Sequence, residues 1–597
     1  MPAWASLLDL PQEIIDLILP HISHNDYASC LRVNTSWRSI FTPSLWQVMR
    51  LGDRTMHECF GTREARIALV RNSQYIRTVE TTDPAFVFAL ACMYPTVTKL
   101  ESLTLRLKDH AFSTVDELLL STDELPATAA TVAPDTKQTI DVPRCTAPVT
   151  LILKNNPNLR YVSLDVGCFR YRDGMEGMLS LAMAFPTAKL EKLELSFLNS
   201  AAYNRDINDG GDEAFDTESF AQYYLAKHNP FPALKEVIIT GGGQNCINPN
   251  RLNFLLRCHN LETARLHRLD SNAMKALIVF LRTGCPKLTT MEWRKGLYDP
   301  EEFIVGLLQA SKLGWKELRL PDMPEFGTDA WEALMQHVGT LEVLRLESAE
   351  HIPTNAVLNL LCSARKLKRL EGIADRQRKR FTRELSVHAH DAFREHLFEG
   401  SNMDWVLGPS VEHLQLHFDC VPRPDVLYRL NGGEFGFHLT GLNPEWRYPA
   451  QNWIYIQLSR MTGLQELVVG LQELSASTVR RNGVDWSMDT AALEEALPEN
   501  DPRVFNYLSL EFSLECGLGL LSGLKEMRML DVRSTAHNIG VAELEWMHTN
   551  WPKLERISGL ESDRRWSIHH EDGPAAKTAV EEWMAAHPRG IGSSFYQ

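Results

Sequence analysis

A short apolar pattern recurs along this chain of 597 residues, and it restricts the possible folds more than any other feature. Each unit has apolar residues at positions 1, 4 and 6. Six units begin at Leu234, Leu261, Leu288, Trp315, Leu341 and Leu367. Successive starts are 27, 27, 27, 26 and 26 residues apart. Chance does not keep such a register over six units, so the chain contains a repeat that builds by stacking.

Each unit combines a strand with a helix. In the unit that begins at Leu341, Leu344 and Leu346 flank an outward Arg345, which is the period-two spacing of a strand with one buried face. Between strands, apolar residues follow helical spacing, as in residues 331–338. Because every unit runs strand then helix and returns in the same direction, we expect neighbouring parallel strands in one curved sheet.

The same strand pattern recurs outside the regular block at looser spacing. It begins at Leu100, Leu159, Leu190, Val411, Leu464 and Leu554, and Leu530 marks a further strand. Short segments before the strands, such as residues 156–159, 285–288 and 551–554, resemble the helix-to-strand corner of leucine-rich repeats. This resemblance covers about residues 70–565 and implies an α/β solenoid with a curved parallel sheet. It says little about function, because this fold serves many unrelated partners.

Residues 7–46 differ in character from the repeats. Proline is favoured at the first position of a helix, so Pro11 predicts a helix start. Glu13 places a favourable carboxylate in the first turn of that helix. Residues 23–26 supply N-cap side chains for a second helix, and residues 36–41 form a third helical segment. An apolar stripe at helical spacing is formed by Ile14, Leu17, Ile18 and Ile22. Three short helices make a bundle too small to be stable alone.

The order of these N-terminal motifs resembles an F-box. Residues 10–14 read Leu-Pro-x-Glu-Ile, residues 31–38 read Leu-x-Val-Asn-x-x-Trp-Arg, and residues 45–46 read Leu-Trp. Asn34 stands where the family commonly has cysteine. The resemblance, to fungal-type F-box proteins with leucine-rich repeats, implies docking onto the Skp-type adaptor of a cullin-based ubiquitin ligase. The repeats would then capture a protein substrate.

The resemblance also implies which side chains bind the adaptor. They are Leu10, Pro11, Ile14, Ile18, Leu31, Val33 and Trp37. Within this set we expect Trp37 to pack internally, and Leu10, Pro11 and Ile14 to make the better contacts. Two alternatives remain open: the helices could simply cap the solenoid, or the chain could be a non-catalytic scaffold whose F-box-like module recruits no ligase.

These observations predict the domain organisation. We place an F-box in residues 1–50, a linker helix in 51–70, the solenoid in 71–565 and a C-terminal tail in 566–597. Insertions are predicted at about residues 122–148, 199–219, 375–408, 430–449 and 475–502. The first is rich in Ala, Thr, Pro and Asp and is expected to be disordered. We expect the N-terminal module to be spatially separate from the repeats.

Composition excludes several functional classes. The net charge of -15 argues against a general nucleic-acid binder, which needs a basic surface. The sequence has no secretory signal and no apolar run of about 18 residues, so no membrane partner is expected. Eleven scattered cysteines without a Cys-x-x-Cys pair fit reduced thiols in the cytoplasm or nucleus.

Motifs for catalysis are missing from the sequence. It contains no phosphate-binding loop, no Gly-x-Ser-x-Gly and no His-Glu-x-x-His, so we expect no enzyme activity and no cofactor. His388, His390 and residues 569–570 lack partners at a recognised metal-binding spacing, and we expect surface histidines and no metal. The basic run at residues 376–380 fits an import signal, a nucleic-acid contact, or a solvated loop or helix face.

The outward side chains of the predicted sheet are candidates for substrate binding. The middle outward position gives Ile238, Arg265, Glu292, Arg319, Arg345 and Glu371, and Arg294 lies in the next column. Guanidinium groups pair bidentately with carboxylates and phosphates, so acidic or phosphorylated segments are suitable ligands. The predicted substrate-binding residues are therefore Arg265, Glu292, Arg294, Arg319 and Arg345. The alternative is an ordinary charged, solvated sheet face.

Overall fold

The computed structural model describes most of the repeats and much of the N-terminal segment. The described residues are 12–51, 63–106, 146–165, 185–197, 230–241, 252–294, 301–320, 326–346, 352–372, 385–398, 404–422, 446–470, 508–560 and 573–587, apart from short gaps within them. The chain divides into two units, Met1–Leu288 and Thr289–Gln597.

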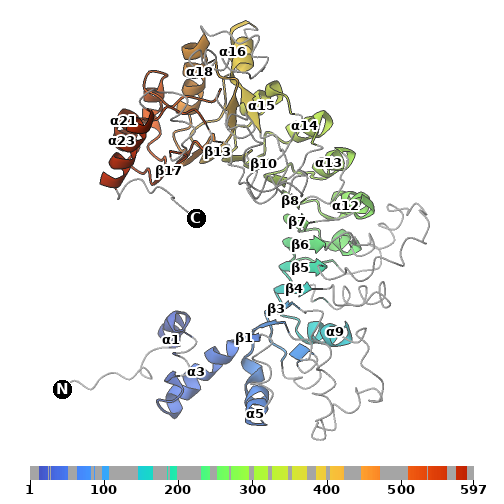
Figure 1. The fold of residues 1–597 in the computed structure, drawn as a ribbon. Helices are drawn as coiled ribbons and strands as arrows, with labels where there is room; N and C mark the ends of the chain where they lie inside the picture. The colour runs from blue at the N-terminus through green and yellow to red at the C-terminus, as the bar shows by residue number, and fades with distance from the viewer. Residues whose placement is uncertain are drawn as a thin grey trace, which may run out of the picture. The chain divides into compact units, whose positions relative to one another are not determined.

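In the first unit, strands pair in parallel and follow one another in chain order (Figure 1). They are β1 (Val48–Leu51), β2 (Thr78–Thr81), β3 (Ser102–Leu105), β4 (Tyr161–Asp165), β5 (Lys192–Phe197), β6 (Glu236–Gly241) and β7 (Thr263–His267). The helical elements include α1 (Gln12–Ile18), η2 (Leu19–His21), α3 (Thr35–Gln47), α5 (Arg63–Asn72), η3 (Ser73–Tyr75), α9 (Thr146–Asn155), η10 (Asn253–Arg257) and α12 (Ser271–Gly284).

The second unit continues the same architecture with shorter strands. Its main sheet holds β8 (Thr290–Arg294), β9 (Glu317–Leu320), β10 (Val343–Leu346), β11 (Arg369–Glu371), β13 (His413–Gln415), β15 (Glu466–Val468), β16 (Met529–Asp531) and β17 (Arg556–Ser558). Its helical elements include α13 (Glu301–Leu308), α14 (Thr328–Met335), α15 (Thr354–Leu361), α16 (Ala389–Phe398), α18 (Arg447–Ser459), η13 (Leu518–Gly523), α21 (Val541–Asn550) and α23 (Gly573–Ala586). Both units confirm the predicted α/β solenoid with a parallel sheet.

The alternation of side chains explains why these segments become strands. In β9, Leu318 and Leu320 are buried, whereas Glu317 and Arg319 are partly exposed. The first residue of each regular unit is fully buried, namely Leu234, Leu261, Leu288, Trp315, Leu341 and Leu367. Burying one such side chain contributes about 1.5–3 kcal/mol, and no unit could bury its own without a neighbour.

Polar side chains link neighbouring units where helices end. The carbonyl of Leu308, the last residue of α13, accepts a hydrogen bond from Trp315 Nε1 at 2.7 Å. His337 Nε2 lies 2.9 Å from the same carbonyl, and burial lowers the pKa of this imidazole. A neutral His337 with its proton on Nε2 is therefore the second donor. These contacts satisfy a carbonyl that the helix itself leaves without a partner.

Asn156 makes a similar link in the first unit. Its side chain, 1% exposed, accepts a hydrogen bond from the Leu100 N–H at 2.9 Å and donates to the Ile152 carbonyl at 2.8 Å. One amide thus joins the end of α9 to the backbone that leads into β3. These two hydrogen bonds explain why asparagine occupies this position of the predicted corner segment.

The N-terminal module is not spatially separate from the repeats, so that expectation is wrong. Val48–Leu51 form β1, which pairs in parallel with β2. The Arg77 N–H donates to the Gln47 carbonyl at 2.9 Å, and Arg50 lies 3.5 Å from Glu80 across the pair. The strand follows the module directly, because α3 ends at Gln47 and β1 begins at the next residue.

The predicted insertions fall mainly outside the described residues. This holds for residues 199–219 and 475–502, for 122–148 up to the start of α9, and for 430–449 up to residue 446. The range 375–408 contains β12 (Ser386–His388) and α16. β12 pairs with β14 (His417–Asp419) in a second, two-stranded parallel sheet. Among the described helices, none has the length and apolarity to cross a bilayer.

We predict that Asn156→Ala lowers the free energy of unfolding by about 2–3 kcal/mol, because it removes two hydrogen bonds and leaves the buried Leu100 N–H without a partner. The matched control is Asn158→Ala, since Asn158 only accepts from Lys189 at an exposed position. We expect the control to change stability by less than about 0.5 kcal/mol. Urea unfolding of both variants measures the difference, and equal midpoints would contradict the role of Asn156.

Candidate functional site

Helix α1 presents apolar side chains to solvent. Ile14, Leu17 and Ile18 are 41%, 67% and 36% exposed. The spacing i, i+3, i+4 places all three on one face of the helix. Ile15 of the same helix is 5% exposed and packs inward. Leu10 and Pro11, predicted as adaptor contacts, lie outside the described residues.

The chain turns twice between α1 and α3. The Asp26 N–H donates to Ser23 Oγ at 3.3 Å, and the Ser23 hydroxyl donates to the Asp26 carboxylate at 2.6 Å. This pairing is the cap predicted for residues 23–26. Leu31 is half-buried in the second turn, and Val33 is 58% exposed just before α3.

Asn34 caps α3. Its backbone is extended, with φ at -164°, and its side-chain oxygen accepts a hydrogen bond from the Trp37 N–H at 2.8 Å. An N-cap asparagine typically stabilises a helix by about 1 kcal/mol relative to alanine. A physical role therefore accounts for asparagine where cysteine is common in the family that the sequence resembles. Half-buried Trp37 lies beside Phe41, with ring centroids 5.5 Å apart.

The exposed side chains Ile14, Leu17, Ile18 and Val33 are called the apolar face below. Single exposed apolar residues are ordinary, but a stripe along one side of a helix indicates a surface for a partner. Leu17 is the most exposed of the four and was not among the predicted adaptor contacts. Its spacing from Ile14 was the signal that could have identified it.

The outward residues of the main sheet form a ladder of charges. In the second unit the register places Glu292 beside Arg319, Arg319 beside Arg345, and Arg345 beside Glu371. The register confirms that the two arginines are direct neighbours. In the first unit, Arg265 is the partner of Ile238 on the preceding strand.

Each arginine of the ladder has a carboxylate of the chain beside it. Arg265 lies 3.4 Å from Glu236, Arg319 lies 3.6 Å from Glu317, and Arg345 lies 3.5 Å from Glu371. Arg294 also pairs with Glu292, at 2.7 Å. The positive charges of these arginines are therefore neutralised within the chain. An anionic ligand would have to displace the paired carboxylates. Such partly exposed pairs contribute little to stability, at most about 1 kcal/mol each.

The histidines predicted to lie on the surface behave differently from one another. His390 is 7% exposed and stacks on Trp446 with centroids 4.9 Å apart, so the surface assignment is wrong for this residue. His388 is half-exposed, and one of its ring nitrogens lies near Asp419 and Cys420. Spacing along the chain could not show this group, because pairing of β12 with β14 brings it together. Residues 376–380 and 569–570 lie outside the described residues.

Comparison with family models identifies the N-terminal segment. Residues 7–51 match the F-box-like family. Comparison with curated proteins finds no match. A chain in the crystal structure of the Rad7 and Elc1 complex in yeast is similar at 11% identity and a TM-score of 0.33, with 96% of each chain covered. That TM-score is too low to support an inference about fold or function.

The F-box-like segment contains both the apolar face and the first strand of the sheet. It begins before Leu10 and Pro11 and ends at Leu51, the last residue of β1. The segment therefore offers exposed apolar side chains at one end and main-chain hydrogen bonds to the solenoid at the other.

Proposed function

We propose that the chain is the substrate-recognition subunit of a cullin-based ubiquitin ligase. The F-box-like segment would dock onto a Skp-type adaptor, and the solenoid would capture a protein substrate. The observation that carries this proposal is the apolar face within the segment that matches the F-box-like family. The chain would act by binding and positioning, without enzyme activity of its own, and catalysis would belong to partner subunits.

The apolar face has the chemistry that a helix-binding groove requires. Ile14, Leu17 and Ile18 occupy one side of α1 at the spacing of helix-in-groove anchors. Covering such side chains contributes about 1–3 kcal/mol each, which is enough for a specific complex when several act together. Exposing apolar side chains of this kind to water is unfavourable in free energy, and a bound partner would relieve it.

The connection to the sheet supports a positioning role. Because β1 follows α3 directly and pairs with β2, main-chain hydrogen bonds attach the end of the F-box-like segment to the sheet. A ligase needs its substrate held at a reproducible place relative to the adaptor. Direct strand pairing provides that restraint at this end of the solenoid.

We infer that the repeats are of the leucine-rich type and that the subunit works in the cytoplasm or nucleus without nucleic acid or membrane as a partner. The buried first position of each regular unit and the 26–27-residue period support the repeat type. The predicted substrate surface is the outward face of the sheet. Because its arginines are ion-paired with carboxylates of the chain, a substrate segment of mixed charge, or one whose phosphates displace Glu317 and Glu371, fits best.

The rival function is a scaffold that uses the same solenoid but recruits no ligase. Both functions need the outward face of the sheet, and only the ligase subunit needs the apolar face to be free for an adaptor. Adaptor binding therefore separates them.

We predict that Ile14→Ala with Leu17→Ala weakens binding of a purified Skp-type adaptor at least about 10-fold, since two apolar anchors are lost. The matched control is Ile67→Ala with Val70→Ala on α5, where both side chains are 49% and 51% exposed but lie outside the F-box-like segment. Calorimetric titration of the full chain measures both variants. Thermal unfolding verifies that each remains folded.

An unchanged affinity of the α1 variant for the adaptor would show that the adaptor does not bind this surface. Absence of any binding by the wild-type chain would favour the scaffold. Equal losses in the α1 and α5 variants would show that the effect is not specific to the apolar face.

We predict that Arg319→Glu with Arg345→Glu reduces capture of substrates recovered by affinity purification of the wild-type chain, while adaptor binding is retained. The reversal places four carboxylates along neighbouring rungs, including Glu292 and Glu371, and repels an acidic segment. The control is Lys316→Glu with Lys368→Glu, which changes the net charge equally at exposed positions just before the strands. Undiminished capture would place the substrate elsewhere on the solenoid.

A further inference from the structure

The small second sheet brings together side chains that are distant in the sequence. β12 and β14 are parallel, and their register pairs Val387 with Phe418 and His388 with Asp419. Side chains of paired residues point to the same face of a sheet. Val387 and Phe418 are buried, whereas His388 and Asp419 are half-exposed on the opposite face at the strand ends.

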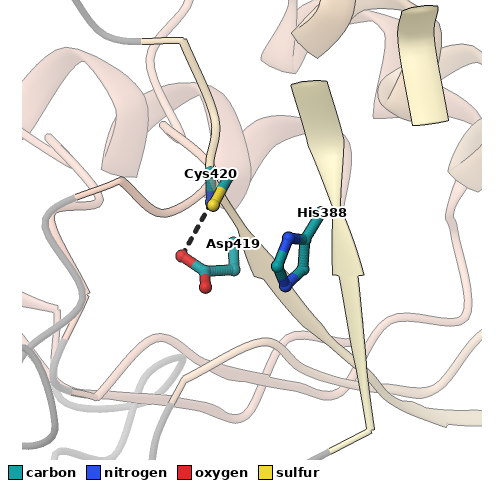
Figure 2. A group of neighbouring side chains, drawn as sticks. All are labelled: His388, Asp419 and Cys420. Carbon is teal, nitrogen blue, oxygen red and sulfur yellow. Dashed lines mark hydrogen bonds between the residues drawn. The ribbon is translucent and has the colours of Figure 1, made fainter. Parts of the chain in front are cut away.

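Cys420 joins this face because its backbone leaves the strand geometry. An extended Cys420 would project from the face opposite to Asp419. Its φ is instead 51°, in the left-handed region that residues other than glycine rarely adopt. The Cys420 N–H donates to Asp419 Oδ1 at 2.7 Å, which orients the carboxylate. Figure 2 shows the three side chains, with His388 on the neighbouring strand.

The three residues offer a nitrogen, an oxygen and a sulfur to one point. One ligand atom from each of His388, Asp419 and Cys420 lies within 4.8 Å of the other two. All three residues are half-buried, so the group is held by the fold and remains open to solvent on one side. Ligand atoms of a tetrahedral zinc site lie roughly 3.5 Å apart. Side-chain rotations that move the three ligand atoms by about 1 Å would therefore bring them to bonding distance from one ion.

The local charge favours a cation. The carboxylates of Asp419 and Asp391 both act electrostatically on the Cys420 thiol. Asp391 Oδ2 also lies 4.0 Å from His388 Nδ1, and Arg394 is 3.9 Å from the same carboxylate group. Within the described part of the chain, Asp419 has no ion pair with a lysine or arginine. A divalent ion would compensate these acidic groups and make the thiolate stable.

We propose that His388, Asp419 and Cys420 bind one Zn²⁺ ion. Zinc accepts imidazole nitrogen, carboxylate oxygen and thiolate sulfur in tetrahedral sites, whereas Mg²⁺ and Ca²⁺ take oxygen ligands. On binding, the Sγ–H bond of Cys420 breaks, the sulfur–zinc bond forms with the same electron pair, and the proton passes to solvent. Asp391, whose Oδ2 lies 4.0 Å from His388 Nδ1 and whose Oδ1 lies 3.4 Å from His390 Nδ1, is the outer carboxylate of the site.

The ion would tie the end of β12 to the end of β14. β14 begins two residues after β13, a strand of the main sheet, whereas β12 precedes α16 within the predicted insertion. Zinc would therefore fasten this additional segment to the solenoid. This site differs from the expectation that the chain holds no metal, and it is independent of the proposed ligase function.

The test uses the untagged full-length chain with Co²⁺ as a spectroscopic probe and Zn²⁺ as competitor. We expect a sulfur-to-cobalt charge-transfer band and visible bands of tetrahedral coordination, both removed by one equivalent of Zn²⁺. Cys420→Ser abolishes the charge-transfer band, and His388→Ala and Asp419→Asn each weaken Zn²⁺ binding at least about 10-fold. Asp391→Asn weakens it by about 10-fold, as expected of an outer partner.

The control is Cys362→Ser. Cys362 is also a half-buried thiol, and burial raises its pKa, but it is not one of the three proposed ligands. A charge-transfer band that survives Cys420→Ser, or is lost in Cys362→Ser, would overturn the proposal. Alkylation of the wild-type chain, read by mass spectrometry, needs no variant: Zn²⁺ should slow modification of Cys420 and leave Cys362 unchanged. Equal alkylation of Cys420 with and without Zn²⁺ would also overturn it.

Discussion

The inability of one repeat to bury its own apolar face is the constraint on which this structure depends. Trp315, Leu318 and Leu320 are covered only because further strands and helices stack on both sides of their unit. A slip of β10 by one residue against β9 would turn Leu344 toward solvent and Arg345 into the core. The apolar pattern therefore fixes the register, and the register places the charges of the outward face.

The same constraint gives the N-terminal segment two roles. A solenoid needs a terminal unit that covers its last apolar layer and its open strand edge. β1 supplies the first strand, and its Leu51 is buried, as is Phe41 of the preceding helix α3. Capping and the proposed adaptor docking, weighed as alternatives from the sequence, would use different residues of one module. The buried residues attach it to the sheet, and the apolar face of α1 points outward.

The repeating features and the F-box-like segment could be predicted from the sequence, whereas particular side-chain contacts and the second small sheet could not. The period identified Leu234 to Leu367 as buried and Arg319 as the neighbour of Arg345, because both follow from one register. It did not predict that Arg319 pairs with Glu317 of its own strand, which depends on side-chain rotamers. Nor did it predict the group of His388 and Asp419, since three-residue strands carry too few apolar residues to be recognised and their pairing spans an irregular stretch.

Hydrogen–deuterium exchange of the full chain, alone and with a Skp-type adaptor, tests the central claim most directly. It reports where the adaptor sits without altering any residue. The account predicts that the adaptor slows exchange in Gln12–Ile18 and around Val33, and leaves the strands β9, β10 and β11 unchanged. Slowed exchange confined to those strands, with α1 unaffected, would contradict the assignment of the apolar face as the docking surface.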